Sequence, residues 1–137
     1  MGERVLVDYE GTLVEGFHIR PGALAVLQYL IAGGHVVILT TFADLENLQF
    51  NLKYDTPSLK PYIGEIITEE TQPNPRIKNP LLHGSRILID DNSKCEDLST
   101  RLGFVWIDPR KREFDPTPAT WSERVIARLQ EVLESPA

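Results

Sequence analysis

The sequence contains a single cysteine, Cys95, and fewer basic than acidic residues. One thiol cannot form an internal disulfide, which excludes a disulfide-rich secreted scaffold. The 14 Lys and Arg residues against 20 Asp and Glu residues give a formal charge of −6. Because that charge repels phosphate backbones and anionic lipids over most of the surface, we do not expect general nucleic-acid binding.

Long hydrophobic runs are also missing. The longest stretch without a charge, within residues 21–42, is interrupted by glycine, glutamine and histidine, so the sequence predicts no membrane span. The first ten residues, MGERVLVDYE, lack the basic and then apolar pattern of a signal peptide. We therefore expect a cytoplasmic protein that is not attached to a membrane.

The remaining composition is that of an ordinary globular chain. Apolar residues make up 42% of the 137 residues and charged residues 25%, which excludes disordered and collagen-like classes. A chain of this length buries one sizeable core, so we expect one domain over residues 1–137.

Short apolar runs alternate with helical patterns along the chain. We expect helices over residues 21–32, with Pro21 at the first helical position, and over 43–52, 95–102 and 121–133. The strands are expected at residues 4–8, 35–41, 65–68, 86–90 and 104–108. Residues 71–80 are proline-rich and predict a loop without a regular element. This alternation predicts an α/β fold: a Rossmann-like, three-layer sandwich around a mostly parallel sheet of five strands.

Polar residues follow three of the predicted strands, where parallel strands bring their carboxyl ends to one edge. They are Asp8 and Glu10, Thr40 and Thr41, and Asp90 and Asp91. Ligands bind beyond this edge in such sheets. Carboxylates gathered there repel one another unless a cation neutralises them, and a hard divalent ion such as Mg²⁺ suits an all-oxygen set with substrate phosphate.

The turn after Asp8 offers groups for phosphate chemistry. The backbone N–H groups of Gly11 and Thr12, with the Thr12 hydroxyl, are placed to cradle phosphoryl oxygens, and Thr41 is a further candidate for phosphate binding. A carboxylate beside a metal-bound phosphate is able to attack it, and an acid two residues later is able to protonate the leaving group. Asp8 and Glu10 have that spacing.

The stretch VLVDYEGTLV resembles the first motif of the haloacid dehalogenase (HAD) superfamily, a hydrophobic strand followed by D-x-D-G-T-L/V. Thr40, at the end of VVILT, is similar to the hydroxyl of the second motif, and Asp90–Asp91 after RILI to the acidic fourth motif. Lys78 lies where the third motif is expected, although Lys60 and Lys94 compete for that role. The sequence RPG at residues 20–22 is also similar to this superfamily.

The resemblance implies a role for each matching residue. Asp8 is expected to be the nucleophile and a Mg²⁺ ligand, while Thr40 and Lys78 hold the transferred phosphoryl group. Asp91 ligates the metal, and Asp90 supports that site or joins it. The residue at position 10 offers its carbonyl to Mg²⁺ and its side chain as general acid and base. Here the usual Asp is Glu10, one methylene longer, which displaces the carboxyl and retunes or impairs catalysis.

The segments between the motifs are too short for the cap domains of many superfamily members, so the chain resembles a capless member. Water then has to be excluded from the site in another way. We expect this to be done by the phosphorylated substrate, a small molecule or a macromolecule, or by a second copy of the chain in a homo-oligomer. The leading hypothesis is a Mg²⁺-dependent phosphatase acting on a phosphate monoester. The alternative is a module that binds a phosphorylated ligand or partner without turnover, and an acyl or haloacid hydrolase comes third.

Overall fold

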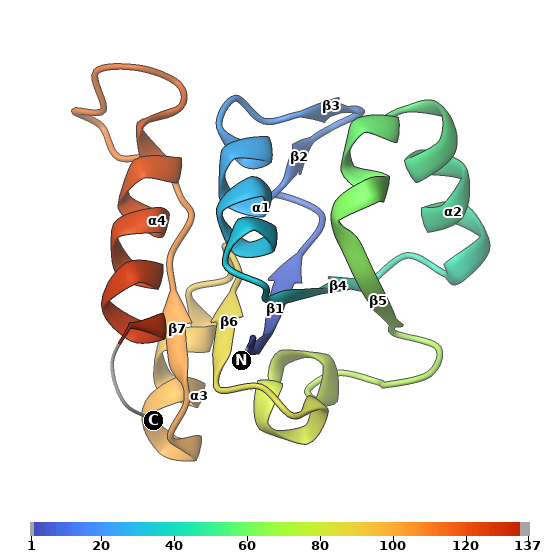
Figure 1. Cartoon of the computed structure of the whole chain (residues 1–137). Coiled ribbons are helices and arrows are strands. Elements are labelled where there is room, and N and C mark those ends of the chain that lie inside the picture. The colour runs from blue at the N-terminus through green and yellow to red at the C-terminus, as the bar shows by residue number, and fades with distance from the viewer. Residues whose placement is uncertain (1, 135–137) are drawn as a thin grey trace.

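The computed structural model describes residues 2–134, and its centre is a five-stranded sheet (Figure 1). The strands are β1 (Arg4–Asp8), β4 (Val36–Thr41), β5 (Ile63–Thr68), β6 (Ile87–Ile89) and β7 (Val105–Ile107). They lie in the order β5-β4-β1-β6-β7, and every neighbouring pair is parallel. The expected fold class, an α/β sandwich around a parallel five-stranded sheet, is confirmed.

Four α-helices cover the sheet: α1 (Ala23–Ala32), α2 (Leu45–Tyr54), α3 (Lys94–Leu102) and α4 (Thr120–Leu133). The expected position of Pro21 at the start of α1 is wrong, because Gly22 is the N-cap residue and adopts φ 94°, which places Pro21 before the helix. Helix α2 begins two residues later than expected, since the Asp44 carboxylate caps it by accepting a hydrogen bond from the Asn47 amide at 2.7 Å.

Side-chain alternation along the strands divides the core into two layers. Val5 and Val7 of β1 pack with α1, α2 and α4 on one face, whereas Leu6 packs on the other face with Cys95 of α3. In Figure 1, α1 and α4 lie side by side on one face, and α3 lies behind β6 and β7. Cys95 and Trp121 are both buried in these layers.

Several short elements were not expected. Strands β2 (Val14–Glu15) and β3 (His18–Ile19) form an antiparallel hairpin after β1. A 3₁₀ helix, η1 (Pro57–Tyr62), precedes β5. The expectation that residues 71–80 form a loop without regular structure is wrong in part, because η2 (Arg76–Lys78) lies within them and η3 (Pro80–His83) begins at their end. Proline fits the first turn of such short helices because that turn leaves its N–H groups unpaired.

None of the helices within residues 2–134 combines the length and the apolar character that crossing a membrane requires.

Candidate active site

The site lies at the carboxyl edge of the sheet, where β1 runs between β4 and β6. Asp8 is the last residue of β1 and pairs in register with Thr40 of β4, while Asp90 directly follows β6. From β1 the chain order runs outward in both directions, to β4 and β5 on one side and to β6 and β7 on the other. Such a reversal opens a crevice beyond the strand ends, which is where parallel α/β sheets bind ligands.

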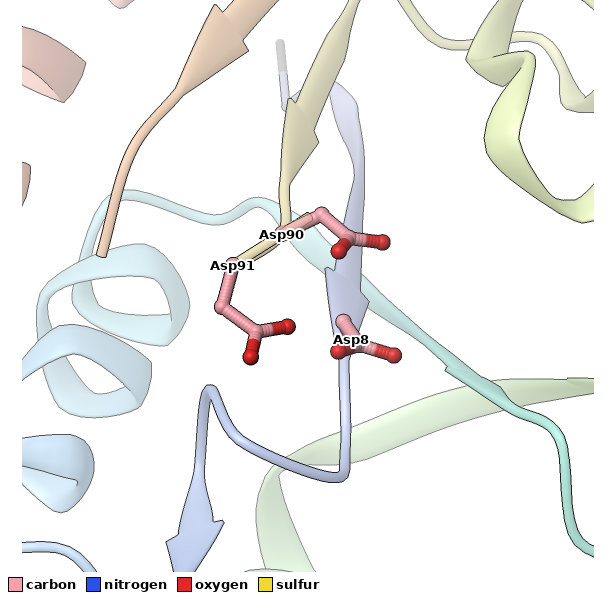
Figure 2. A group of neighbouring side chains, drawn as sticks. All are labelled: Asp8, Asp90 and Asp91. Carbon is pink, nitrogen blue, oxygen red and sulfur yellow. The ribbon is translucent and has the colours of Figure 1, made fainter. Parts of the chain in front are cut away.

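Three carboxylates meet at this edge of the sheet. Asp8, Asp90 and Asp91 each place one oxygen within 4.8 Å of the others, and Figure 2 shows the three side chains converging from β1 and from the loop after β6. Asp8 is 3% exposed and Asp90 is fully buried. Burial, reinforced by the charge of Asp90, raises the pKa of Asp8 to about 9. Burial also raises the pKa of Asp90. A compact all-oxygen set whose charge is so poorly solvated fits a hard divalent cation.

Lys78 reaches these carboxylates from η2. Its ammonium lies 3.9 Å from the Asp8 carboxylate and forms a hydrogen-bonded ion pair with Asp90. Burial acts to lower the pKa of Lys78, but Asp8 and Asp90 attract the ammonium and the net shift is upward, so the ammonium stays charged. The competing lysines, Lys60 and Lys94, are exposed and make no ion pair with these acids.

Strand alternation explains which threonine faces this cluster. Asp8, Thr40 and Asp90 continue the side of the sheet that carries Leu6, Ile38 and Leu88, the face covered by α3 and η2. Thr40 is fully buried, and within residues 2–134 its hydroxyl has no hydrogen-bond partner. An unpaired buried hydroxyl is costly, and a phosphoryl oxygen is a ligand that would satisfy it.

Thr41 points the other way, and its hydroxyl contacts Glu10. That hydroxyl lies 2.7 Å from both oxygens of the Glu10 carboxylate and accepts a hydrogen bond from the Ala43 amide at 3.1 Å. The Phe42 amide also donates to Glu10, at 3.4 Å. The Thr41 hydroxyl therefore positions Glu10, whose carboxylate lies outside the group of three close acids.

The turn after β1 is held tightly. Gly11 adopts φ 78°, a conformation that favours glycine, and a Cβ at this position would lie 2.2 Å from an Asp91 oxygen and displace that carboxylate. The Gly11 amide donates to the Val14 carbonyl at 2.9 Å. Thr12 is fully buried, and its hydroxyl donates to the Asp8 carboxylate at 3.4 Å. The Thr12 hydroxyl thus orients Asp8.

Arg20 is a positioning residue that sequence reasoning did not assign. Its buried guanidinium donates to the carbonyls of Gly11, Thr12 and Pro109 at 3.2, 2.9 and 3.0 Å, and lies 3.9 Å from the centre of the Trp121 ring. These contacts tie the Asp8 turn to the loop after β7. The sequence signal for Arg20 was the RPG stretch. A buried guanidinium is stable only where several carbonyl groups accept its hydrogen bonds.

The more spacious cavities lie away from this chemistry. One of about 560 Å³ opens at the amino ends of the strands, near Arg4 and Arg86, and one of about 350 Å³ lies between α2 and β5, near Lys60. A smaller cavity of about 190 Å³ borders Lys78 on the α3 side. The concentration of buried charge, and not cavity size, identifies the site.

No protein-family model and no curated protein sequence matches this chain. Solved structures that are similar to it include the following two. One is the core domain of a predicted phosphoglycolate phosphatase from Streptococcus pneumoniae TIGR4, with a TM-score of 0.58 and 17% identity, covering 99% of this chain and 98% of that one. The other is a protein called MT0777, with a TM-score of 0.51 and 17% identity, covering 99% of this chain and 100% of that one. At this identity the likeness shows the shared fold.

Proposed function

We propose that this protein is a Mg²⁺-dependent phosphohydrolase that cleaves a phosphate monoester through an aspartyl-phosphate on Asp8. The observation that carries the proposal is the convergence of Asp8, Asp90 and Asp91 within 4.8 Å, with the Lys78 ammonium against two of them. The sequence resemblance to the HAD superfamily and the HAD-type fold support the same chemistry.

The residues that would hold Mg²⁺ are Asp8 and Asp91 through their carboxylates and Glu10 through its main-chain carbonyl, with Asp90 supporting or joining them. Bound Mg²⁺ supplies the positive charge that keeps Asp8 ionised and offsets the charge of the phosphoryl oxygens. The pKa of Asp8 is raised when no such positive charge is present.

The proposed reaction has two displacements at phosphorus. An Asp8 carboxylate oxygen forms a bond to phosphorus while the ester P–O bond breaks, and the Glu10 carboxyl gives its proton to the departing alcohol. Water then attacks the aspartyl-phosphate, Glu10 takes its proton, and the bond between phosphorus and Asp8 breaks to release phosphate. Lys78 and the unpaired hydroxyl of Thr40 bind the phosphoryl oxygens in both steps.

We further propose that the protein acts without a cap domain. The β2–β3 hairpin fills the segment after Asp8, and α2, η1 and β5 fill most of the segment between Thr41 and Lys78. Water exclusion then depends on the phosphorylated substrate, small molecule or macromolecule, or on a neighbouring copy in a homo-oligomer.

A module that binds a phosphorylated ligand without turnover is the second candidate. The observation in its favour is the contact of both Glu10 oxygens with Thr41, because it draws the carboxylate away from the three close acids. A binding module needs the residues that bind the cation and the phosphate, but it does not need a mobile acid at position 10.

Phosphate release from a panel of monoesters tests the proposal, with Mg²⁺ or EDTA present. We expect metal-dependent release that falls at least about 10³-fold in Asp8→Asn, since that variant lacks the nucleophile. Asp97→Asn is the matched control, because Asp97 is an exposed residue of α3 that pairs with Arg101, and it should keep full activity. Saturable binding of phosphate or its analogues with no release from any ester would favour the binding module instead.

A further inference from the structure

One side chain at the site has no role in the chemistry proposed above. Phe42 follows Thr41 directly, and its ring centre lies 4.6 Å from the Lys78 ammonium. Its backbone amide donates to Glu10 at 3.4 Å. Phe42 therefore contacts two groups of the proposed chemistry: its ring contacts the lysine proposed to hold the phosphoryl oxygens, and its amide contacts the acid proposed to protonate the leaving alcohol.

The position of Phe42 is not explained by packing. Its side chain is 49% exposed, and it belongs to neither of the two hydrophobic clusters that form the core. One side of the ring contacts a buried cation, a favourable cation–π arrangement, and much of the rest faces solvent. Exposed aromatic surface beside a reactive centre is a typical binding surface for a ligand.

The charge around the ring limits what binds there. Lys78 is already engaged by Asp8 and Asp90, and Glu10 is the charged group next to the Phe42 amide. A leaving group with a second negative charge would meet the Glu10 carboxylate. A neutral, flat, apolar group would instead bury area against the ring at no electrostatic cost.

We propose that Phe42 forms a subsite for an aromatic ring on the alcohol portion of the substrate, which makes the substrate an aryl or arylalkyl phosphate. This inference rests on the proposed function, because the ring is placed by its contact with Lys78 and by the contact of the Phe42 amide with Glu10. The contact with the leaving group exists before and during the reaction, so it lowers KM more than it raises kcat.

Two phosphonates separate this inference from catalysis, because their P–C bond is not cleaved. Calorimetry with Mg²⁺ compares 2-phenylethylphosphonate with ethylphosphonate, which differ by the ring alone. We expect the protein to bind the phenyl compound more tightly and Phe42→Ala to reduce that preference about tenfold. Phe42→Tyr should restore it, whereas Phe42→Leu should restore only part of it. Equal affinity for both phosphonates, or the same preference in Phe42→Ala, would overturn the inference, as would no binding of either.

The control is Phe50→Ala. Phe50 is similarly exposed on α2 and packs against Tyr54, with ring centres 4.8 Å apart, so its removal should not alter the preference. Loss of the preference in Phe50→Ala would count against Phe42 as the subsite.

A turnover assay with 2-phenylethyl phosphate and ethyl phosphate completes the test. The two alcohols leave with similar ease, so the ratio of their kcat/KM values reports the ring contact. The inference expects Phe42→Ala to lower that ratio through KM. A phenyl preference in phosphonate binding without hydrolysis of either ester would leave the subsite standing and contradict the proposed catalysis.

Discussion

The two ends of the parallel sheet differ in how their charged side chains are paired and solvated. At the amino ends, the Glu3 carboxylate accepts two hydrogen bonds from Arg86, both at 2.7 Å, and Arg4 binds Glu65 in the same two-pronged manner at 3.0 and 2.5 Å. Hydrogen bonding to the paired arginine lowers the pKa of Glu3 and of Glu65. Each charge there has a partner and access to water.

At the carboxyl ends, three carboxylates lie close together, and one lysine pairs with two of them. Asp8 and Asp90 are buried, and burial raises the pKa of both. The carboxyl ends, where the chemistry is proposed, thus hold buried carboxylates at a cost in free energy. The amino ends hold ion pairs in which each charge has a partner. This contrast is typical of functional sites, which hold charge that the ligand or metal neutralises.

Replacing Lys78 should have the largest effect on the free energy of unfolding. Lys78→Met keeps most of the length of the side chain but leaves buried Asp8 and Asp90 without the cation that they contact. We therefore expect the free energy of unfolding to fall by about 3 kcal/mol. Urea denaturation measures it. The matched change at the other end, Arg4→Met, removes an exposed pair and should cost less than about 1 kcal/mol. Equal losses in the two variants would show that the ends do not differ.

The pH dependence of stability should also distinguish the two ends. Without metal, folded Asp8 has a pKa raised to about 9, so between its ordinary pKa and about pH 9 the folded chain binds a proton that the unfolded chain has lost. The free energy of unfolding therefore falls with rising pH, by at most about 1.4 kcal/mol per unit from this one group. Asp8→Asn should remove this fall in thermal denaturation, and Mg²⁺ should reduce it.

Glu3→Gln provides the opposite case. The lowered pKa of Glu3 contributes stability that is fully present above its ordinary pKa and is lost as the pH falls. Glu3→Gln should therefore lower stability by a constant amount at neutral pH and change the pH dependence only on the acid side. A fall above neutral pH that persists in Asp8→Asn would contradict the role of Asp8, and one that Mg²⁺ leaves unchanged would contradict the metal assignment.

Much of the fold was predictable, because the buried strands are uninterrupted apolar runs and glycine marks the end of α1. The β2–β3 hairpin was missed since each strand has two residues, too few for alternation to be visible. The 3₁₀ helix η1 was hidden by Pro57 and Pro61, because prolines are typical of loops, although Pro57 suits the first turn of a short helix.

The site was predictable to the extent that it follows from topology. Asp8, Asp90 and Asp91 had to meet once the strands were parallel and β1 was central. To tell that Lys78, and not Lys60 or Lys94, reaches the acids, one has to know the path of residues 69–86. No periodic pattern in the sequence predicts that path. Alternation alone could have separated Thr40 from Thr41, whereas the contact of Thr41 with Glu10 depends on side-chain conformations.

Glu10 lies at the carboxyl edge, and the Thr41 hydroxyl holds its carboxylate outside the cluster of three acids. Glu10→Asp withdraws the carboxylate by roughly 1.5 Å, the length of one C–C bond, and so breaks the contact with Thr41. We expect kcat for monoester hydrolysis to fall about tenfold or more, because the acid is no longer held in place.

Thr41→Val tests the same contact from the other side. It should lower kcat as well, and the double variant should be little worse than Glu10→Asp alone, since both changes remove one interaction. Glu65→Asp, an equal shortening in an exposed pair at the amino end, should leave kcat within about twofold. A rise in kcat for Glu10→Asp would mean that Glu10 impairs an otherwise ordinary acid position, and that its contact with Thr41 competes with catalysis and does not support it.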